Sequence, residues 1–320
     1  MRITLFDTMA KKEDASTPAA EKQHLKELTQ QEEERKIDQE LDKIEDEEEK
    51  GGGHGSDKLK EGEQILKEQM RTSLLEYRRD PPALFVSAFS AGLEVGFSLL
   101  LMGLLYTMFS DQLSESGMHL AMAAAYPIGF IFVIIGRSEL FTEHTTLAVL
   151  PVLNGTVSVQ ALAKLWGIVY VGNLMGGYLF SFILVQIGPG MGTISLDAFH
   201  HIAEKLIQYN WWLTLSSGMF AGWLMGLLSW LVTSSRDTIS RVLMIILVTT
   251  VIGLGELHHS IVGSIEMFAG LISSDDINFN DYLHFQVFAT LGNIIGGTVF
   301  VAAIKYGQLG DRTFISRSNQ

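Results

Sequence analysis

Apolar runs long enough to cross a lipid bilayer fill the chain from about residue 83 to residue 306. A membrane-spanning helix needs about 20 consecutive apolar residues, because its backbone polar groups find no water in the hydrocarbon core. The sequence therefore predicts an all-α membrane protein. Its six transmembrane helices are expected at residues 83–108, 118–152, 159–187, 207–232, 241–272 and 282–306.

Polar residues interrupt two of these predicted helices at membrane depth. Residues 136–144 read Gly-Arg-Ser-Glu-Leu-Phe-Thr-Glu-His, and residues 251–260 read Val-Ile-Gly-Leu-Gly-Glu-Leu-His-His-Ser. Ionisable groups are costly inside a membrane, so their presence there indicates a functional site. We predict that the second and fifth helices are broken and that the breaks lie at the functional centre.

The two interruptions belong to an internal repeat. At an offset of about 117 positions, Gly136, Glu139 and Leu140 match Gly253, Glu256 and Leu257. A Gly-Asn motif followed by Gly-Gly, at 172–177, recurs at 292–297. We predict two three-helix repeats that are inverted in the membrane, because three spans separate equivalent points. Broken helices at matching positions of two halves point to a transport site.

Charge divides the chain into unequal parts. The sequence carries 23 Lys and Arg against 36 Asp and Glu, and these residues are densest before the apolar runs. We expect a charged cytoplasmic extension, disordered or helical, that ends in a Gly-rich linker (1–57), then an amphipathic cytoplasmic helix (58–80). The pore domain (81–308) and a cytoplasmic tail (309–320) follow. The chain has no cysteine, which excludes disulfide and thiolate chemistry.

The distribution of basic residues predicts the orientation of the membrane domain. Lysine and arginine are enriched on the cytoplasmic side of membrane proteins. The connections at 111–117 and 273–281 contain neither residue, whereas the side of the termini carries Arg78, Arg79, Arg236, Arg241, Lys305, Arg312 and Arg317. Both termini are therefore expected in the cytoplasm.

The ionisable residues at the breaks suggest two kinds of role. Glu139 and Glu256 are predicted to cap backbone N–H groups that the breaks leave free, with a proton relay as the alternative. His259, beside His258, can change charge near neutral pH and can hydrogen-bond an anion or give it a proton. The alternative for His259 is a buried structural histidine bonded to a backbone carbonyl. The hydroxyl of Thr142, in the first break, is expected to face the same point.

Several motifs together resemble the formate/nitrite transporter family. They are Glu139-Leu-Phe-Thr142 after a glycine, Gly172-Asn173, His259-Ser260-Ile261 and Gly292-Asn293 followed by Gly296-Gly297. The similarity covers about residues 83–308 and is greatest to the inner-membrane branch with a long charged N-terminal extension. It implies an aquaporin-like protomer, a homopentamer with one pore per subunit, and passage of small monovalent anions such as formate, nitrite, hydrosulfide, acetate or lactate.

The resemblance also implies roles for individual residues. His259 matches the central pore histidine of the family, and Thr142 matches the threonine that faces it. The expected apolar constrictions are formed by Leu140, Phe130 and Ile252. Tyr126 is the expected pore-lining aromatic residue. Asn173 and Asn293 are expected to be structural residues at the helix breaks.

Four positions depart from the family pattern. His258, which we include among the pore residues, stands where the family often has glutamate. Gly263 and Gly222 replace asparagines, and Lys205 is out of register by one position with a basic residue of the vestibule. These departures leave the identity of the anion open.

We predict a multi-pass inner-membrane protein for small monovalent anions that is either a channel or a proton-coupled transporter, in which His259 can donate a proton. One alternative is a pore for water or small neutral solutes. Another is a non-transporting scaffold with a regulatory N-terminal segment. The sequence shows no nucleophile triad, phosphate loop or metal cluster, so we expect no enzyme activity, cofactor, bound metal or nucleic-acid partner. The expected partners are the anion, protons, the lipid bilayer and further copies of the chain.

Overall fold

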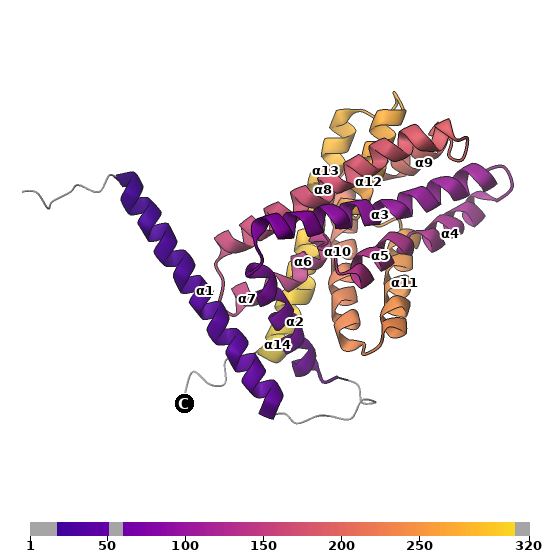
Figure 1. Cartoon of the computed structure of the whole chain (residues 1–320). Coiled ribbons are helices and arrows are strands. Elements are labelled where there is room, and N and C mark those ends of the chain that lie inside the picture. Colours follow the sequence, from indigo (N-terminus) through magenta and orange to yellow (C-terminus); the bar gives the residue numbers. More distant parts are fainter. Residues whose placement is uncertain (1–17, 51–59, 311–320) are drawn as a thin grey trace, which may run out of the picture.

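The computed structural model describes residues 18–50 and 60–310, which form helices and connections without a strand (Figure 1). The all-α prediction is therefore confirmed for this part of the chain. The predicted linker at 51–56 and most of the predicted tail lie outside the described residues. In chain order the elements are α1 (Pro18–Lys50), α2 (Gly62–Tyr77), α3 (Pro81–Phe109), α4 (Glu115–Ala125), α5 (Pro127–Gly136), α6 (Phe141–Leu147), α7 (Leu150–Leu153), α8 (Val159–Gly190), α9 (Leu196–Ile207), α10 (Trp211–Ser234), α11 (Thr238–Leu254), α12 (Ser260–Ser273), α13 (Phe279–Ile295), η1 (Gly296–Ala303) and α14 (Ile304–Gly310).

Five helical stretches are long and apolar enough to cross a membrane by length and composition. They are 81–109, 115–136, 159–190, 211–234 and 279–308. The shorter apolar helices α11 and α12 occupy the region of the fifth predicted span. Interruptions therefore lie where the sequence placed them, between α5 and α6 and between α11 and α12. The inverted relation of two three-helix halves stays a prediction.

The loop predicted between the third and fourth spans is wrong, because residues 196–207 form the helix α9. Ser195 caps this helix by accepting a hydrogen bond from the backbone N–H of Ala198. Phe199, Ile202 and Ala203 are buried against the bundle. Apolar residues recur here at helical spacing, and this short amphipathic pattern was masked by neighbouring polar residues.

The final span contains a widened turn, the π-helical segment η1. Such a turn frees backbone carbonyl groups from the regular α-helical pattern. Threonines of α6 lie against it: the Thr146 hydroxyl donates to the carbonyl of Gly297 at 3.2 Å, and the Thr298 hydroxyl donates to the carbonyl of Thr145 at 3.0 Å. The last helix is thereby joined to the half-helix that follows the first break.

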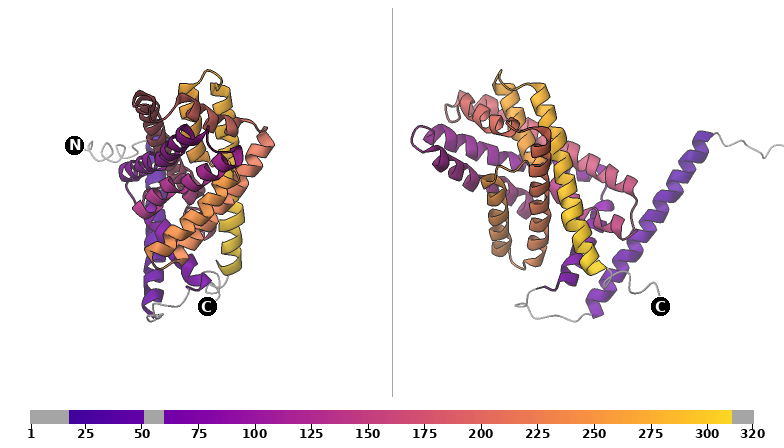
Figure 2. Two further views of the ribbon diagram at one scale, coloured as in Figure 1. Left: turned by 90° about the vertical axis from the view of Figure 1, so that its right-hand side faces the viewer. Right: turned by 180° about the vertical axis from the view of Figure 1, so that it is seen from behind.

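The N-terminal helices lie at one end of the bundle, where α1 extends past the membrane-length helices (Figures 1 and 2). Leu66, Met70 and Leu74 of α2 are fully buried. The C-terminal half of α1 packs its few apolar residues, among them Ile37 and Ile44, into the same core. Ion pairs reinforce this contact on the outer face: Lys67–Glu47, Arg71–Glu45 and Arg78–Asp38.

Candidate functional site

The two helix breaks are built on the same backbone scheme. The chain turns through a left-handed conformation at Arg137 (φ 58°) and again at Glu256 (φ 47°). After each turn a new helix begins, and an asparagine from a distant helix accepts the hydrogen bond of its first N–H. Phe141 N donates to Asn173 Oδ1 and Ser260 N donates to Asn293 Oδ1, both at 2.8 Å.

Each of these two buried asparagines also donates two hydrogen bonds. Asn173 Nδ2 donates to the carbonyls of Ala88 and Glu139, both at 2.8 Å. Asn293 Nδ2 donates to the carbonyls of Gly218 and His258, both at 2.9 Å. The amide therefore ties the end of a break to a membrane-length helix. Backbone groups that an interrupted helix would leave unpaired in the membrane are satisfied in this way.

A glycine makes room for each asparagine. A Cβ atom at Gly92 would lie 2.1 Å from the carbonyl oxygen of Asn173, and one at Gly222 would lie 2.3 Å from that of Asn293. The sequence comparison placed Gly222 among the departures from the family pattern. In this protein it is the residue that lets α10 approach the backbone of α13.

The backbone conformation of the two breaks gives a different spacing between equivalent residues from the 117 positions that the matching residue types suggested. Arg137 and Glu256, which share the left-handed conformation, are 119 positions apart. The residues just before the new helices, Leu140 and His259, have the same spacing. Glu139 is therefore equivalent to His258 rather than to Glu256. The backbone conformation at each break defines which residues are equivalent, and the shared Glu-Leu dipeptide does not.

The predicted capping role of the two glutamates is also wrong, because the asparagines cap the helices. The Glu139 carboxylate accepts hydrogen bonds from Arg79 Nη1 and His144 Nε2, both at 2.5 Å. Arg79 also pairs with Glu76, whose pKa is raised by burial and then by the Glu139 charge. This group of ionisable residues joins α2 to the half-helix α6.

The central polar contact of the molecule joins the two breaks. Thr142 Oγ1 lies 2.9 Å from His259 Nε2, and both side chains are buried. The backbone N–H of Val262 donates to His259 Nδ1 at 3.3 Å, so Nδ1 is the acceptor nitrogen and we assign the ring proton to Nε2. The Nε2–H group then donates to Thr142. These partners differ from the backbone carbonyl expected of a purely structural histidine.

Buried apolar and aromatic side chains lie near this pair, and the constriction role expected of Phe130, Leu140 and Ile252 stays a prediction. The rings of Phe130 and His259 meet edge to face with centroids 5.2 Å apart, and the ring of Tyr126 is 5.4 Å from that of Phe130. Leu140 and Ile252 are fully buried. The structure thus brings the threonine, the histidine and Phe130 into contact.

His258 makes its contacts elsewhere. Its ring Nδ1 lies 2.9 Å from Ser217 Oγ, and Nε2 lies 3.3 Å from the carbonyl of Leu206. Its own carbonyl accepts from Asn293. His258 therefore ties the second break to α9 and α10, and it is absent from the described residues that line the pocket below.

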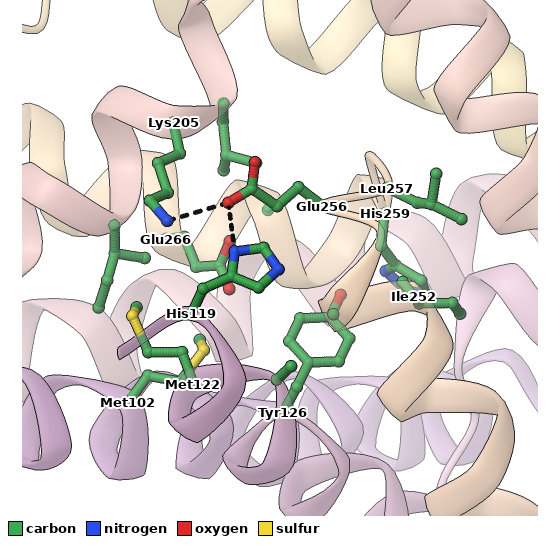
Figure 3. Close-up of a pocket in the computed structure, with 15 residues that line it drawn as sticks. Met102, His119, Met122, Tyr126, Lys205, Ile252, Glu256, Leu257, His259 and Glu266 are labelled. Carbon is green, nitrogen blue, oxygen red and sulfur yellow. Dashed lines mark hydrogen bonds and ion pairs between the residues drawn. The ribbon is translucent and has the colours of Figure 1, made fainter. Parts of the chain in front are cut away.

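A pocket that is open to the surface reaches His259 (Figure 3). Tyr126, Ile252 and His259 lie at its inner end, while Met102, Met122 and Ile202 contribute apolar walls. Its titratable side chains are His119, Tyr126, Lys205, Glu256, His259 and Glu266. Glu256 Oε1 accepts from Lys205 Nζ at 2.9 Å and lies 3.0 Å from His119 Nδ1.

Glu266 was missed by the sequence predictions. It follows His259 by seven positions, with Gly263 between them, so the three residues share one face of α12. It is also the single charged residue in the otherwise apolar helix that starts the second half of the break. Its helical spacing from His259 and its isolated charge were the sequence features that could have identified Glu266 as a candidate site residue.

Comparisons with known proteins point to one family of membrane proteins. A family model described as formate/nitrite transporter matches residues 63–307. The inner membrane protein YfdC of Escherichia coli K12 is 33% identical over 284 residues, which cover 86% of this chain and 89% of the relative. The nitrite transporter NirC of Salmonella typhimurium is 27% identical over 230 residues, covering 69% of this chain and 81% of the relative.

Solved structures show the same fold. A chain described as an FNT family ion channel has a TM-score of 0.68 at 24% identity, covering 76% of this chain and 98% of that one. A pentameric formate channel with formate bound has a TM-score of 0.62 at 23% identity, covering 72% and 97%.

The fold, with two helix breaks that meet at a buried polar pair, is shared with an FNT family ion channel. The chain belongs to the formate/nitrite transporter family. Residues 1–62 precede the part that the family model matches.

Proposed function

We propose that this protein passes small monovalent anions across the bacterial inner membrane, between Thr142 and His259. The observation that carries the proposal is the 2.9 Å contact between these side chains at the inner end of the pocket. Relatives named as a nitrite transporter and a formate channel support the anion as substrate. The relative named an inner membrane protein supports the location, and the arginine distribution supports cytoplasmic termini.

Hydrogen-bond donors at the pair fit an anion. The Nε2–H of His259 has Thr142 as its partner, and the Thr142 hydroxyl, which accepts that bond, keeps its own hydrogen for another acceptor. An anion between them would accept from both groups. Such donors replace part of the hydration that an ion loses in an apolar constriction.

Apolar groups restrict the same path. Phe130, Leu140 and Ile252 are fully buried around the pair, so a permeant ion sheds water there. The low polarity strengthens every hydrogen bond that remains, and it favours sharing the His259 proton with the anion. If His259 first takes up a second proton, transfer of that proton to the anion would return the ring to neutral imidazole and let the substrate cross the constriction as a neutral acid.

The assembly proposed is a homopentamer with one pathway in each subunit. The supporting observation is the fold shared with a pentameric formate channel. Within one chain the two breaks already provide both members of the Thr142–His259 pair. The pathway is therefore proposed within the subunit, and no cofactor, metal or nucleic acid enters it.

Flux measurements in liposomes test this function. We expect selective uptake among formate, nitrite, acetate, lactate and hydrosulfide by the wild-type protein, after subtraction of protein-free liposomes. His259→Ala should lower that flux by about tenfold or more at both pH 5 and pH 7, because a hydrogen bond to a charged group contributes about 1.5–3 kcal/mol. His200→Ala removes a histidine outside the pocket and should retain wild-type flux.

Two outcomes would contradict the proposal. Water or a small neutral solute passing equally through wild-type protein and His259→Ala, with no anion flux in either, would favour the neutral-solute pore. No flux of any solute through correctly folded protein would favour the non-transporting scaffold.

A further inference from the structure

The carboxyl group of Glu266 lines the pocket without a charged or hydrogen-bonded partner. Its side chain is 6% exposed and comes from α12, whose first residue follows His259. Glu266 lies seven positions after His259, a separation of about 10 Å along the helix axis. Among the described residues, none forms an ion pair or a hydrogen bond with this carboxyl group.

The lysine that lines the same pocket is already paired with another carboxylate. Lys205, from α9, pairs with Glu256 at 2.9 Å, and His119, from α4, contacts the same oxygen at 3.0 Å. Figure 3 shows these three side chains gathered together, with Glu266 beside them and His259 farther along the pocket. Lys205 therefore offsets Glu256 and leaves Glu266 uncompensated.

The resulting charge is unsuited to an anion when Glu266 is ionised. With the histidines and Tyr126 neutral, the groups lining the pocket carry one positive and two negative charges. An anion that approaches His259 then enters a pocket of net charge −1, and two like charges repel strongly in a partly buried site. Protonation of Glu266 removes the excess charge and turns its carboxyl group into a hydrogen-bond donor.

We propose that Glu266 is a specificity-determining residue that admits the anion only in its protonated form. Its carboxyl group takes up a proton from the solution on the pocket side, and its O–H then donates to the entering anion. The anion continues to Thr142 and His259, and loss of the proton from Glu266 restores the repulsion behind it. Transport thereby depends on acid at a second position, separate from the histidine. This inference rests on the proposed function.

Substitution of Glu266 by glutamine tests the inference through a pH profile. Glu266→Gln keeps the shape of the side chain and cannot ionise. Formate flux would be measured in liposomes with the same pH on both sides, which makes protein orientation irrelevant. The wild-type ratio of flux at pH 6 to flux at pH 9 should fall by on the order of tenfold in Glu266→Gln, because flux at pH 9 rises once the charge is gone.

Glu256→Gln is the matched control. It makes the same change of charge in the same pocket, but its carboxylate is paired with Lys205. Whatever its absolute flux, it should keep the wild-type ratio between pH 6 and pH 9. An equal loss of the ratio in both variants would mean that general pocket charge, and not Glu266, controls entry, and would overturn the inference.

A second variant covers the case in which Glu266→Gln does not fold. Glu266→Met replaces an unpaired buried acid by an apolar side chain of similar length, a change that folded proteins tolerate. It should also flatten the profile between pH 6 and pH 9, with less flux at pH 6 than wild type because the donor is lost. Elution as a single species and a cooperative thermal transition establish folding for each variant.

The outcomes separate the two proposals. If Glu266→Gln or Glu266→Met keeps the wild-type ratio while His259→Ala abolishes flux, the proposed function stands and the role of Glu266 is refuted. If wild-type protein passes no anion at any pH, both proposals fall.

Discussion

The first helix break, before α6, and the second, before α12, share their backbone bonds and differ in the side chains around them. In both, a left-handed residue ends one helix and a buried asparagine caps the next. Around the first break Glu139 is held by Arg79 and His144. At the second, His259 faces the pocket.

This difference separates the groups that hold the fold from the groups that perform chemistry. The asparagines and the glycines that accommodate them recur in both halves, as expected for a construction that any broken membrane helix requires. The ionisable residues at equivalent positions differ in kind, because Glu256 corresponds to Arg137 and His258 corresponds to Glu139. One break is joined to the N-terminal helices, and the other provides the histidine of the proposed pathway.

The largest expected effect comes from removing the shared construction. Asn173→Leu and Asn293→Leu each eliminate three buried hydrogen bonds and leave backbone groups unpaired, which should destabilise the fold by about 3 kcal/mol. Thermal unfolding in detergent would measure both, and the two losses should be similar. Asn210→Leu removes an exposed asparagine cap and should cost about 1 kcal/mol. An asparagine variant no less stable than this control would refute the capping scheme.

A smaller effect should distinguish the glutamates of the two breaks. Glu139 is mostly buried and contacts a fully buried histidine, so Glu139→Gln should destabilise the protein by about 2 kcal/mol. Glu256 and Lys205 are each about a quarter to a third exposed, and Glu256→Gln should cost about 0.5 kcal/mol. The same unfolding assay compares them. Equal losses would show that the two carboxylates are equivalent after all.

Sequence patterns were enough to predict the features that depend on a single segment of the chain. Hydropathy located the membrane-length helices, and polar residues within apolar runs located both breaks. The contact between Thr142 and His259 was expected from the resemblance to the family and is present in the structure. These signals are strong because a membrane tolerates few exceptions to them.

Features that depend on contacts between distant segments were not accessible in this way. The capping of Phe141 by Asn173 joins residues 32 positions apart, and nothing local distinguishes it from capping by Glu139. The dipeptide Glu-Leu, present at both breaks, suggested the wrong register. The helix α9 was not predicted because its apolar face is short. Glu266 was not predicted because the sequence does not show that its side chain lines a pocket.

The central claim is that an anion passes between Thr142 and His259, and a double-mutant cycle on formate flux tests it most directly. Thr142→Val and His259→Gln would be measured singly and together in liposomes at one pH. Each single change should lower flux by about tenfold, and the double variant should be little worse than either, because the two groups act on the same ion. Effects that multiply, or a single variant with wild-type flux, would place the anion path elsewhere.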